Sequence, residues 1–168
     1  MIDKNNGTLE EFFTYHSPIG LLQFTASQGQ ITSVCFVDRE KNNSGFDTTL
    51  QKNIIRQMDG YFEGTLFTFD LPLAPQGTVF QKKVWKALET IDYGHSLSYG
   101  ELALKLKDKN LVRAVGGANS KNPVAIIVPC HRVIGVNNKL VGYAGGLWRK
   151  KWLLRHELDH CTTKNQLF

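Results

Sequence analysis

The chain has 168 residues and a mass of 18.9 kDa, which is enough for one substantial hydrophobic core or two small ones. Hydrophobic residues make up 42% and charged residues 21%, so disorder as the main state is excluded, and three cysteines are too few for a disulfide scaffold. The longest apolar run, residues 123–129, is much shorter than the roughly 20 residues of a membrane helix, so we expect no membrane partner. Residues 1–6 lack the basic and apolar segments of a secretory signal, which predicts a cytoplasmic protein.

The formal charge of +5 is unevenly distributed along the chain. Residues 1–73 contain five Lys and Arg against nine Asp and Glu, a net charge of −4, whereas residues 74–168 contain fifteen against six, a net charge of +9. A strongly basic half favours a polyanion such as nucleic acid as its partner. A basic face that only keeps the protein soluble is the alternative that composition leaves open.

The N-terminal half begins with the pattern of an antiparallel sheet. Runs of strand-forming residues at 11–16, 21–26 and 31–37 are separated by the turn clusters 17–20 and 27–30. Three short strands with such tight connections predict a meander.

A helix is expected after these strands. Thr48 and Gln51 form a capping-box pattern, and apolar residues then recur at helical spacing, namely Leu50, Ile54, Met58 and Tyr61. Residues 66–71 predict one more strand. His16 and Cys35 lie within strand patterns and are interpreted as packing residues, so no chemistry is assigned to this half.

The boundary between two domains, 1–75 and 76–168, is expected where Pro and Gly residues break the pattern and the charge changes sign. In the second domain, capping boxes at Thr78 and Ser98 begin two helices, and a third helix begins near Leu111. Two short helices joined by a tight polar turn are typical of a helix-turn-helix. We therefore expect an α+β fold, in which a small domain of antiparallel sheet plus helix precedes a mostly helical, winged-helix-like domain.

The helix near Leu111 contains two adjacent glycines, Gly116 and Gly117, and few large side chains. Each glycine costs about 1 kcal/mol in a helix interior, so some other structure must come close to this backbone. Tight packing against another helix is one explanation. Close approach of a nucleic acid is the other, with Arg113 as the single large cation.

An apolar run, residues 124–128, predicts a buried strand or extended segment that delivers Cys130 and His131 at its end. A nucleophilic cysteine must form a thiolate, and a histidine is a suitable neighbour. Adjacent residues of an extended chain point to opposite sides, so contact between the two needs a water bridge or a bent backbone. From spacing alone, a buried and inert cysteine is the commoner outcome.

Several motifs of the second domain occur together and in order. They are Ser98-Tyr99-Gly100-Glu101-Leu102-Ala103, Arg113-Ala114-Val115-Gly116-Gly117-Ala118, Asn122-Pro123, Pro129-Cys130-His131-Arg132-Val133, Gly142-Tyr143, Gly145-Gly146-Leu147 and Trp152-Leu153-Leu154-Arg155-His156-Glu157. This set, which spans residues 78–157, resembles the O(6)-alkylguanine-DNA alkyltransferases, also called methylated-DNA–protein-cysteine methyltransferases. The N-terminal half matches that family only in length and strand pattern.

The resemblance implies a DNA repair protein that flips O(6)-alkylguanine, and O(4)-alkylthymine, out of duplex DNA and moves the alkyl group irreversibly to its own cysteine. Such a single-turnover suicide enzyme uses no metal and no organic cofactor, its partner is double-stranded DNA carrying alkylated bases, and it is a monomer. A non-catalytic lesion sensor of the same fold is the main alternative, against which the presence of Cys130 argues. A cysteine hydrolase is a second alternative, but it leaves the basic half unexplained.

The resemblance also assigns catalytic roles residue by residue. Cys130 is the alkyl acceptor, and His131 acts on it through a water while Glu157 orients His131. Asn122 orders the bend before the active-site segment. Tyr99 crowds the phosphate beside the flipped nucleotide and donates a proton to the guanine ring.

Other residues are assigned to DNA and to the lesion. Arg113 is expected to insert into the base stack where the damaged nucleotide leaves. The remaining DNA-binding residues are, together with Tyr99, Ala114, Gly116, Gly117, Ala118, Asn119 and Ser120. The residues expected to line the lesion pocket are Tyr143, Ala144, Gly145 and Val133.

Overall fold

The computed structural model describes residues 11–40 and 44–164. Residues 1–6, on which the expectation about a secretory signal rests, lie outside these ranges, as do the start of the first expected domain and the end of the second. Within the described ranges, no helix is long and apolar enough to cross a membrane.

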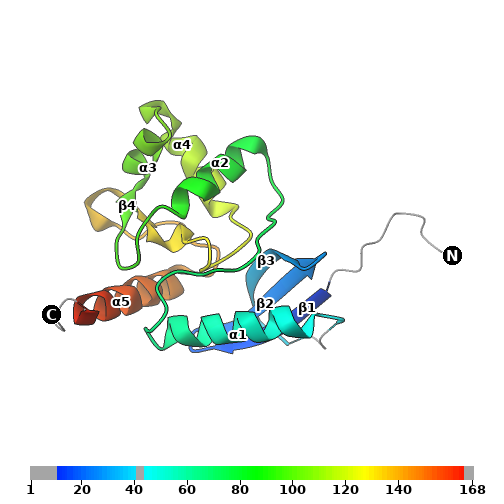
Figure 1. The fold of residues 1–168 in the computed structure, drawn as a ribbon. Coiled ribbons are helices and arrows are strands. Elements are labelled where there is room, and N and C mark those ends of the chain that lie inside the picture. The colour runs from blue at the N-terminus through cyan, green and yellow to red at the C-terminus, as the bar shows by residue number, and fades with distance from the viewer. Residues whose placement is uncertain (1–10, 41–43, 165–168) are drawn as a thin grey trace.

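The N-terminal half is a three-stranded antiparallel meander with one long helix beside it (Figure 1). Its elements are β1 (Glu11–Ser17), β2 (Gly20–Ser27), β3 (Gln30–Val37) and α1 (Thr48–Phe62). The three strands and the helix expected from the sequence are thus confirmed. Sheet and helix share a core, in which Phe13 and Phe24 of the strands and Ile54 and Met58 of α1 are buried.

Two local expectations for this half are wrong. Asp47, not Thr48, caps α1, because its Oδ1 accepts a hydrogen bond from the backbone N of Leu50 at 2.6 Å. Residues 66–71 form no strand: the side chain of Gln57 bonds the N and O of Asp70, each at 2.8 Å, in place of a neighbouring strand.

The interpretation of His16 and Cys35 as packing residues is also wrong. Both side chains are exposed, because they lie on the face of their strands that points away from the core. His16 Nε2 lies 3.1 Å from a carboxylate oxygen of Glu40.

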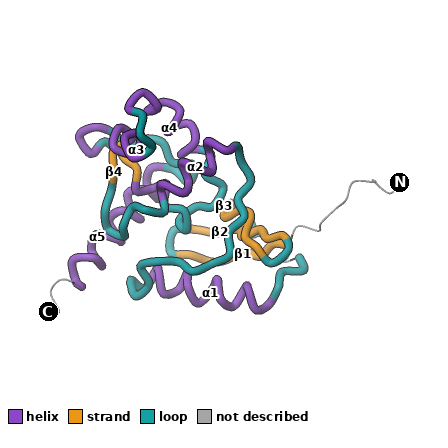
Figure 2. Tube along the Cα trace, turned by 45° about the horizontal axis from the view of Figure 1, so that its top comes forward, coloured by secondary structure: helices purple, strands orange, loops and turns teal. Residues whose placement is uncertain are grey.

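The C-terminal half is mostly helical, so the α+β fold class holds. Its helices are α2 (Val79–Leu88), α3 (Tyr99–Lys105), α4 (Val112–Ser120) and α5 (Leu147–Lys164), and two short parallel strands are β4 (Leu97–Ser98) and β5 (Val133–Ile134). Both expected capping boxes, at Thr78 and Ser98, are present. Figure 2 shows α2, α3 and α4 gathered on one side of the molecule and the sheet with α1 on the other.

Helices α3 and α4 form the expected helix-turn-helix, with a 3-10 turn (Lys109–Leu111) between them. Helix α4 packs on α2, where the indole N of Trp85 donates to the backbone O of Ala118 at 2.9 Å. Val115 is fully buried at the same contact. This packing leaves the opposite side of α4 exposed.

The outer edge of β3 joins the two halves. Ile31 bridges to Leu73 of the connection, and Val34 bridges to Val124, close to the active-site segment. Residues 124–128 are therefore neither the buried strand nor the extended segment that the apolar run predicted. After the single bridge at Val124, residues 125–127 turn, with a φ of 70° at Ile126, and a 3-10 turn (Cys130–Arg132) follows.

Candidate active site

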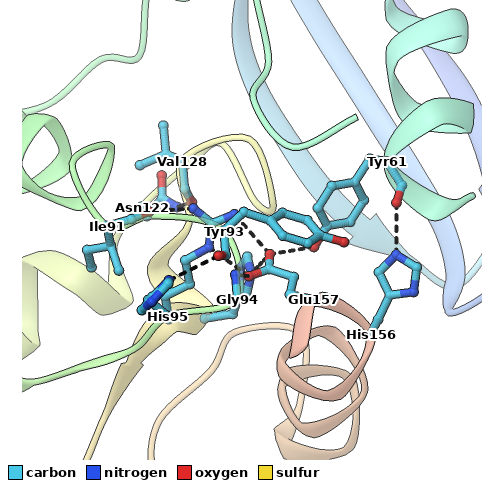
Figure 3. Close-up of polar contacts among 11 residues, drawn as sticks. Tyr61, Ile91, Tyr93, Gly94, His95, Asn122, Val128, His156 and Glu157 are labelled. Carbon is cyan, nitrogen blue, oxygen red and sulfur yellow. Dashed lines mark hydrogen bonds and ion pairs between the residues drawn. The ribbon is translucent and has the colours of Figure 1, made fainter. Parts of the chain in front are cut away.

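Cys130 lies in a tight turn whose entry is fixed by Asn122. The side chain of Asn122 donates to the backbone O of Val128 at 2.8 Å and accepts from the N of Val124 at 3.0 Å, as Figure 3 shows in part. The backbone is bent here, which is one of the two arrangements that contact between Cys130 and His131 needs. The Cys130 side chain is 7% exposed, so it is nearly closed off from water.

His131 belongs to a buried polar cluster centred on Glu157. His131 Nε2 lies 2.8 Å from Glu157 Oε1, and Arg132 reaches both oxygens, with Nε 2.8 Å from Oε2 and Nη2 3.0 Å from Oε1. The Gly94 N donates to Oε2 at 3.2 Å, and the Tyr61 hydroxyl donates to Oε1 at 2.8 Å (Figure 3). Glu157 comes from helix α5, and Tyr61 comes from α1. His131 and Arg132 both come from the turn after Pro129.

The charges of this cluster follow from its burial and its neighbours. Burial alone raises the pKa of the Glu157 carboxyl, but the hydrogen bonds from His131 and Arg132 and the charge of Arg132 outweigh it, so the pKa lies well below its usual range. Burial lowers the pKa of His131 despite the opposing effect of Glu157. His131 is therefore neutral near pH 7, with its proton on Nε2, facing the carboxylate. Its Nδ1 is buried and has no hydrogen-bond partner within the described chain, so its lone pair is free.

The Cys130 thiol is held in its protonated form by burial. Burial raises its pKa, while a hydrogen bond from Asn122 and the charge of Lys150 act in the opposite direction. Lys150 is fully buried and donates to the backbone O of Val133 at 2.6 Å and of Val141 at 2.7 Å. Burial lowers the pKa of Lys150 to about 8. Sequence reasoning missed this lysine, because Lys150 and Lys151 together look like a solvated helix face.

A cavity of about 120 Å³ opens beside Cys130. Three of the expected pocket residues line it, namely Tyr143, Ala144 and Gly145. Val133 does not: it lies in the hydrophobic core, and only its carbonyl reaches the site, through Lys150. Residues of β3 complete the wall, although sequence reasoning assigned no chemistry to that half; they are Val34, Cys35 and Phe36.

Helix α4 separates the expected DNA-binding residues into two groups. Arg113, Ala114, Gly117 and Ser120 are exposed, and Gly116 is half-buried. Ala118 and Asn119 are buried, because the helical repeat that turns Val115 inward also turns them inward. Asn119 Nδ2 donates to the backbone O of Cys130 at 3.4 Å and lines the cavity, so it lies at the reaction site and not on the exposed face.

The two glycines of α4 are not explained by tight packing. A Cβ at Gly117 would have no neighbour within 4 Å beyond its own helix, in the part of the chain that is described. A Cβ at Gly116 would lie 3.8 Å from the Tyr99 ring, an ordinary contact. Tyr99 is half-buried between α4 and the loop at Gly142, where its hydroxyl lies 3.7 Å from the position of a Cβ. Tyr99 thus lies beside Gly142, which lines the cavity, although Tyr99 itself is not one of the lining residues.

Arg113 makes no ion pair or side-chain hydrogen bond within residues 11–40 and 44–164. Within these residues, Arg113 therefore makes no contact that would cap or bridge its own helix. Its exposed guanidinium stands beside Ala114 on the face of α4 that carries Gly117.

Comparisons with known proteins cover nearly the whole chain. Two family models match: 6-O-methylguanine DNA methyltransferase, ribonuclease-like domain, at residues 12–75, and 6-O-methylguanine DNA methyltransferase, DNA binding domain, at residues 79–158. The methylated-DNA–protein-cysteine methyltransferase of Mycolicibacterium paratuberculosis is 43% identical over 94% of this chain and 98% of its own length. That of Methanosarcina acetivorans is 45% identical over 85% of this chain and 95% of its own length.

Solved structures of similar fold point to the same family. The structure of Mycobacterium tuberculosis OGT in complex with DNA has a TM-score of 0.80 and 42% identity, over 89% of this chain and 93% of that one. The O6-methylguanine methyltransferase of the same organism has a TM-score of 0.79 and 39% identity, over 90% and 94%. The chain belongs to the 6-O-methylguanine DNA methyltransferase family.

Proposed function

We propose that this protein repairs DNA by moving the alkyl group of O(6)-alkylguanine, and of O(4)-alkylthymine, to its own Cys130. The observation that carries the proposal is a cysteine at a small cavity, next to a neutral histidine whose Nδ1 is free and whose Nε2 is held by a buried carboxylate. Family membership supports the reaction class. The lesion itself is the alkyl donor, so the reaction needs no metal and no organic cofactor.

The first step is removal of the thiol proton. Because Glu157 fixes the Nε2–H of His131, the free Nδ1 accepts the proton of Cys130, either directly or through one water. The resulting imidazolium lies 2.8 Å from the Glu157 carboxylate, which stabilises its charge. Lys150 and the Asn122 side chain favour the thiolate.

The second step is a displacement at the alkyl carbon. A bond forms between Cys130 Sγ and that carbon while the bond between the carbon and the base oxygen breaks, with its electron pair leaving on the base. Tyr99, which lies beside Gly142 of the cavity lining, donates a proton to the leaving base. The product is a thioether, which water does not cleave under these conditions, so each molecule reacts once.

The lesion reaches Cys130 only if its nucleotide leaves the duplex, because the reacting carbon is otherwise inside the base stack. The exposed face of α4 fits this task. Gly117 lets a DNA backbone come close, and Arg113 is free to fill the vacated space. We also propose that the protein acts as a monomer in the cytoplasm, with the division into domains 1–75 and 76–168.

Intact mass after incubation with a duplex containing O(6)-methylguanine tests the proposal. Wild type should gain one methyl group and no more, and peptide mapping should place it on Cys130. The Cys130→Ser variant should bind the duplex without gaining mass. Binding without an adduct in wild type would indicate a lesion sensor, and turnover without an adduct would indicate a hydrolase.

A further inference from the structure

Tyr61, near the end of α1, makes two contacts with consecutive residues of α5. Its hydroxyl donates to Glu157 Oε1 at 2.8 Å, and its backbone O lies 2.8 Å from Nε2 of His156 (Figure 3). Tyr61 and Glu157 are each 1% exposed, so neither contact competes with water. The N-terminal half therefore touches the buried carboxylate of the candidate active site directly.

The contact involves the oxygen that holds His131. Oε1 of Glu157 receives the hydrogen bonds of Tyr61 and His131, both at 2.8 Å, and that of the Arg132 Nη2 at 3.0 Å, whereas Oε2 receives those of the Arg132 Nε and the Gly94 N. Aromatic neighbours fix the Tyr61 ring in place; the ring centroids of Phe62, Phe69 and Tyr93 lie 5.2, 5.3 and 5.9 Å away. The fixed ring therefore directs the Tyr61 hydroxyl to Oε1 of Glu157.

We propose that Tyr61 is a positioning residue for alkyl transfer, whose hydroxyl orients the Glu157 carboxylate and takes up part of its charge, so that His131 stays a neutral base. The inference rests on the proposed function and deepens it. It assigns a part in the reaction to the N-terminal half, through a residue that does not touch the substrate.

The physical consequence concerns the strength of the His131–Glu157 pair. A hydrogen bond to a carboxylate stabilises its charge and makes it a weaker acceptor for other donors. Without the Tyr61 hydroxyl, Oε1 attracts the His131 proton more strongly, which favours the imidazolium form. The His131–Glu157 pair also faces Arg132, Lys150, Tyr93 and Tyr143, and a phenylalanine at position 61 leaves all of these in place.

The Tyr61→Phe variant tests this inference. We expect the pKa of His131, measured by NMR on ring-nitrogen-labelled protein, to rise by about half a unit or more. The acidic limb of the rate of methyl transfer against pH should move upward by the same amount, which makes transfer about threefold slower on that limb. At higher pH, where His131 is neutral in both proteins, the rates should converge.

Tyr15→Phe is the matched control, because the Tyr15 hydroxyl, like that of Tyr61, donates to a carboxylate. Its acceptor is Asp59 of α1, at 2.7 Å, and not Glu157. The Tyr15→Phe change should cost stability without shifting His131. If Tyr61→Phe folds poorly, 3-fluorotyrosine at position 61 keeps the hydroxyl as a stronger donor and should lower the pKa of His131.

The outcomes separate the two proposals. A wild type that takes no methyl group overturns the proposed function. If wild type reacts, a His131 pKa that is the same in the Tyr61 variants, or that moves equally in Tyr15→Phe, overturns the inference about Tyr61.

Discussion

Replacing Glu157 by glutamine should destabilise the protein strongly, although the side-chain shape hardly changes. In the described chain the carboxylate accepts five hydrogen bonds, including two from Arg132 and one each from His131, Tyr61 and Gly94. In Glu157→Gln an amide NH₂ replaces one acceptor oxygen, so the N–H and O–H groups that bonded to that oxygen now face another donor. The Arg132 charge also stays buried without its negative partner. Removing one partner of such a buried pair costs about 3–5 kcal/mol of the free energy of unfolding. A domain of this size has only about 5–15 kcal/mol in total.

The free energy of unfolding that Glu157→Gln loses should depend on pH in a defined direction. The folded pKa of Glu157 lies below the value of about 4.3 in an unfolded chain, so its contribution to stability is complete well above that pH. It is lost as the pH falls through the folded pKa. The difference between wild type and Glu157→Gln should therefore be greatest at neutral pH and should narrow below about pH 4.

Urea unfolding of both proteins at a series of pH values measures this difference. Asp159→Asn is the control on the same helix, because Asp159 pairs with Arg155 at 2.9 Å on the exposed surface, where such a pair contributes about 0.5 kcal/mol or less. A loss in Glu157→Gln that is as small as in the control refutes the argument. So does a large loss that stays constant down to about pH 3.

Four further outcomes are expected. Because burial raises the pKa of Cys130, the second-order rate of methyl transfer should increase from pH 6 to pH 8, and a flat profile would show that thiolate formation does not limit the reaction. Binding to undamaged duplex should weaken with salt with a log–log slope of about −0.9 per phosphate contact, and a slope near zero would contradict a DNA-binding role of the basic half. Gly117→Leu should raise the free energy of unfolding by up to about 1 kcal/mol while it lowers DNA affinity, and unchanged affinity in a binding titration would separate α4 from the DNA. Arg113→Ala should slow repair in duplex DNA far more than reaction with the free base, because a free base pays no unstacking cost, and an unchanged ratio of the two rates would remove Arg113 from the flipping step.

Local sequence patterns predicted most of the fold. The capping boxes at Thr78 and Ser98 succeeded because both partners of each hydrogen bond lie within four residues. The strand expected at residues 66–71 failed because strand formation needs a neighbouring edge, and the Gln57 side chain takes the backbone groups of Asp70 instead. A long-range contact decided the outcome there, and no local pattern records it.

The same distinction separates what could and could not be predicted of the candidate site. Cys130 and His131 stand in one motif and were found, whereas Tyr61 lies 96 positions from Glu157 and looks like one more apolar position of a helix. Cys35 and Phe36 were missed because the bridge from Val34 to Val124 brings β3 to the cavity. These residues come from the half with no motif, and only the folded chain places them at the site.

The cluster around Glu157 also accounts for the arginine that follows the Cys-His pair. A buried carboxylate that faced His131 alone would draw a proton onto the imidazole, and an imidazolium cannot accept the thiol proton of Cys130. Burial lowers the pKa of His131, and the charge of Arg132, which shares that carboxylate, lowers it further, so the ring stays neutral although it lies 2.8 Å from an anion. Arg132 in turn stays buried because Glu157 and the backbone O of Ile91, 2.6 Å from Nη1, satisfy its donors. The same ion pair that holds α5 against the active-site turn thus keeps the proposed base in the form that the reaction requires.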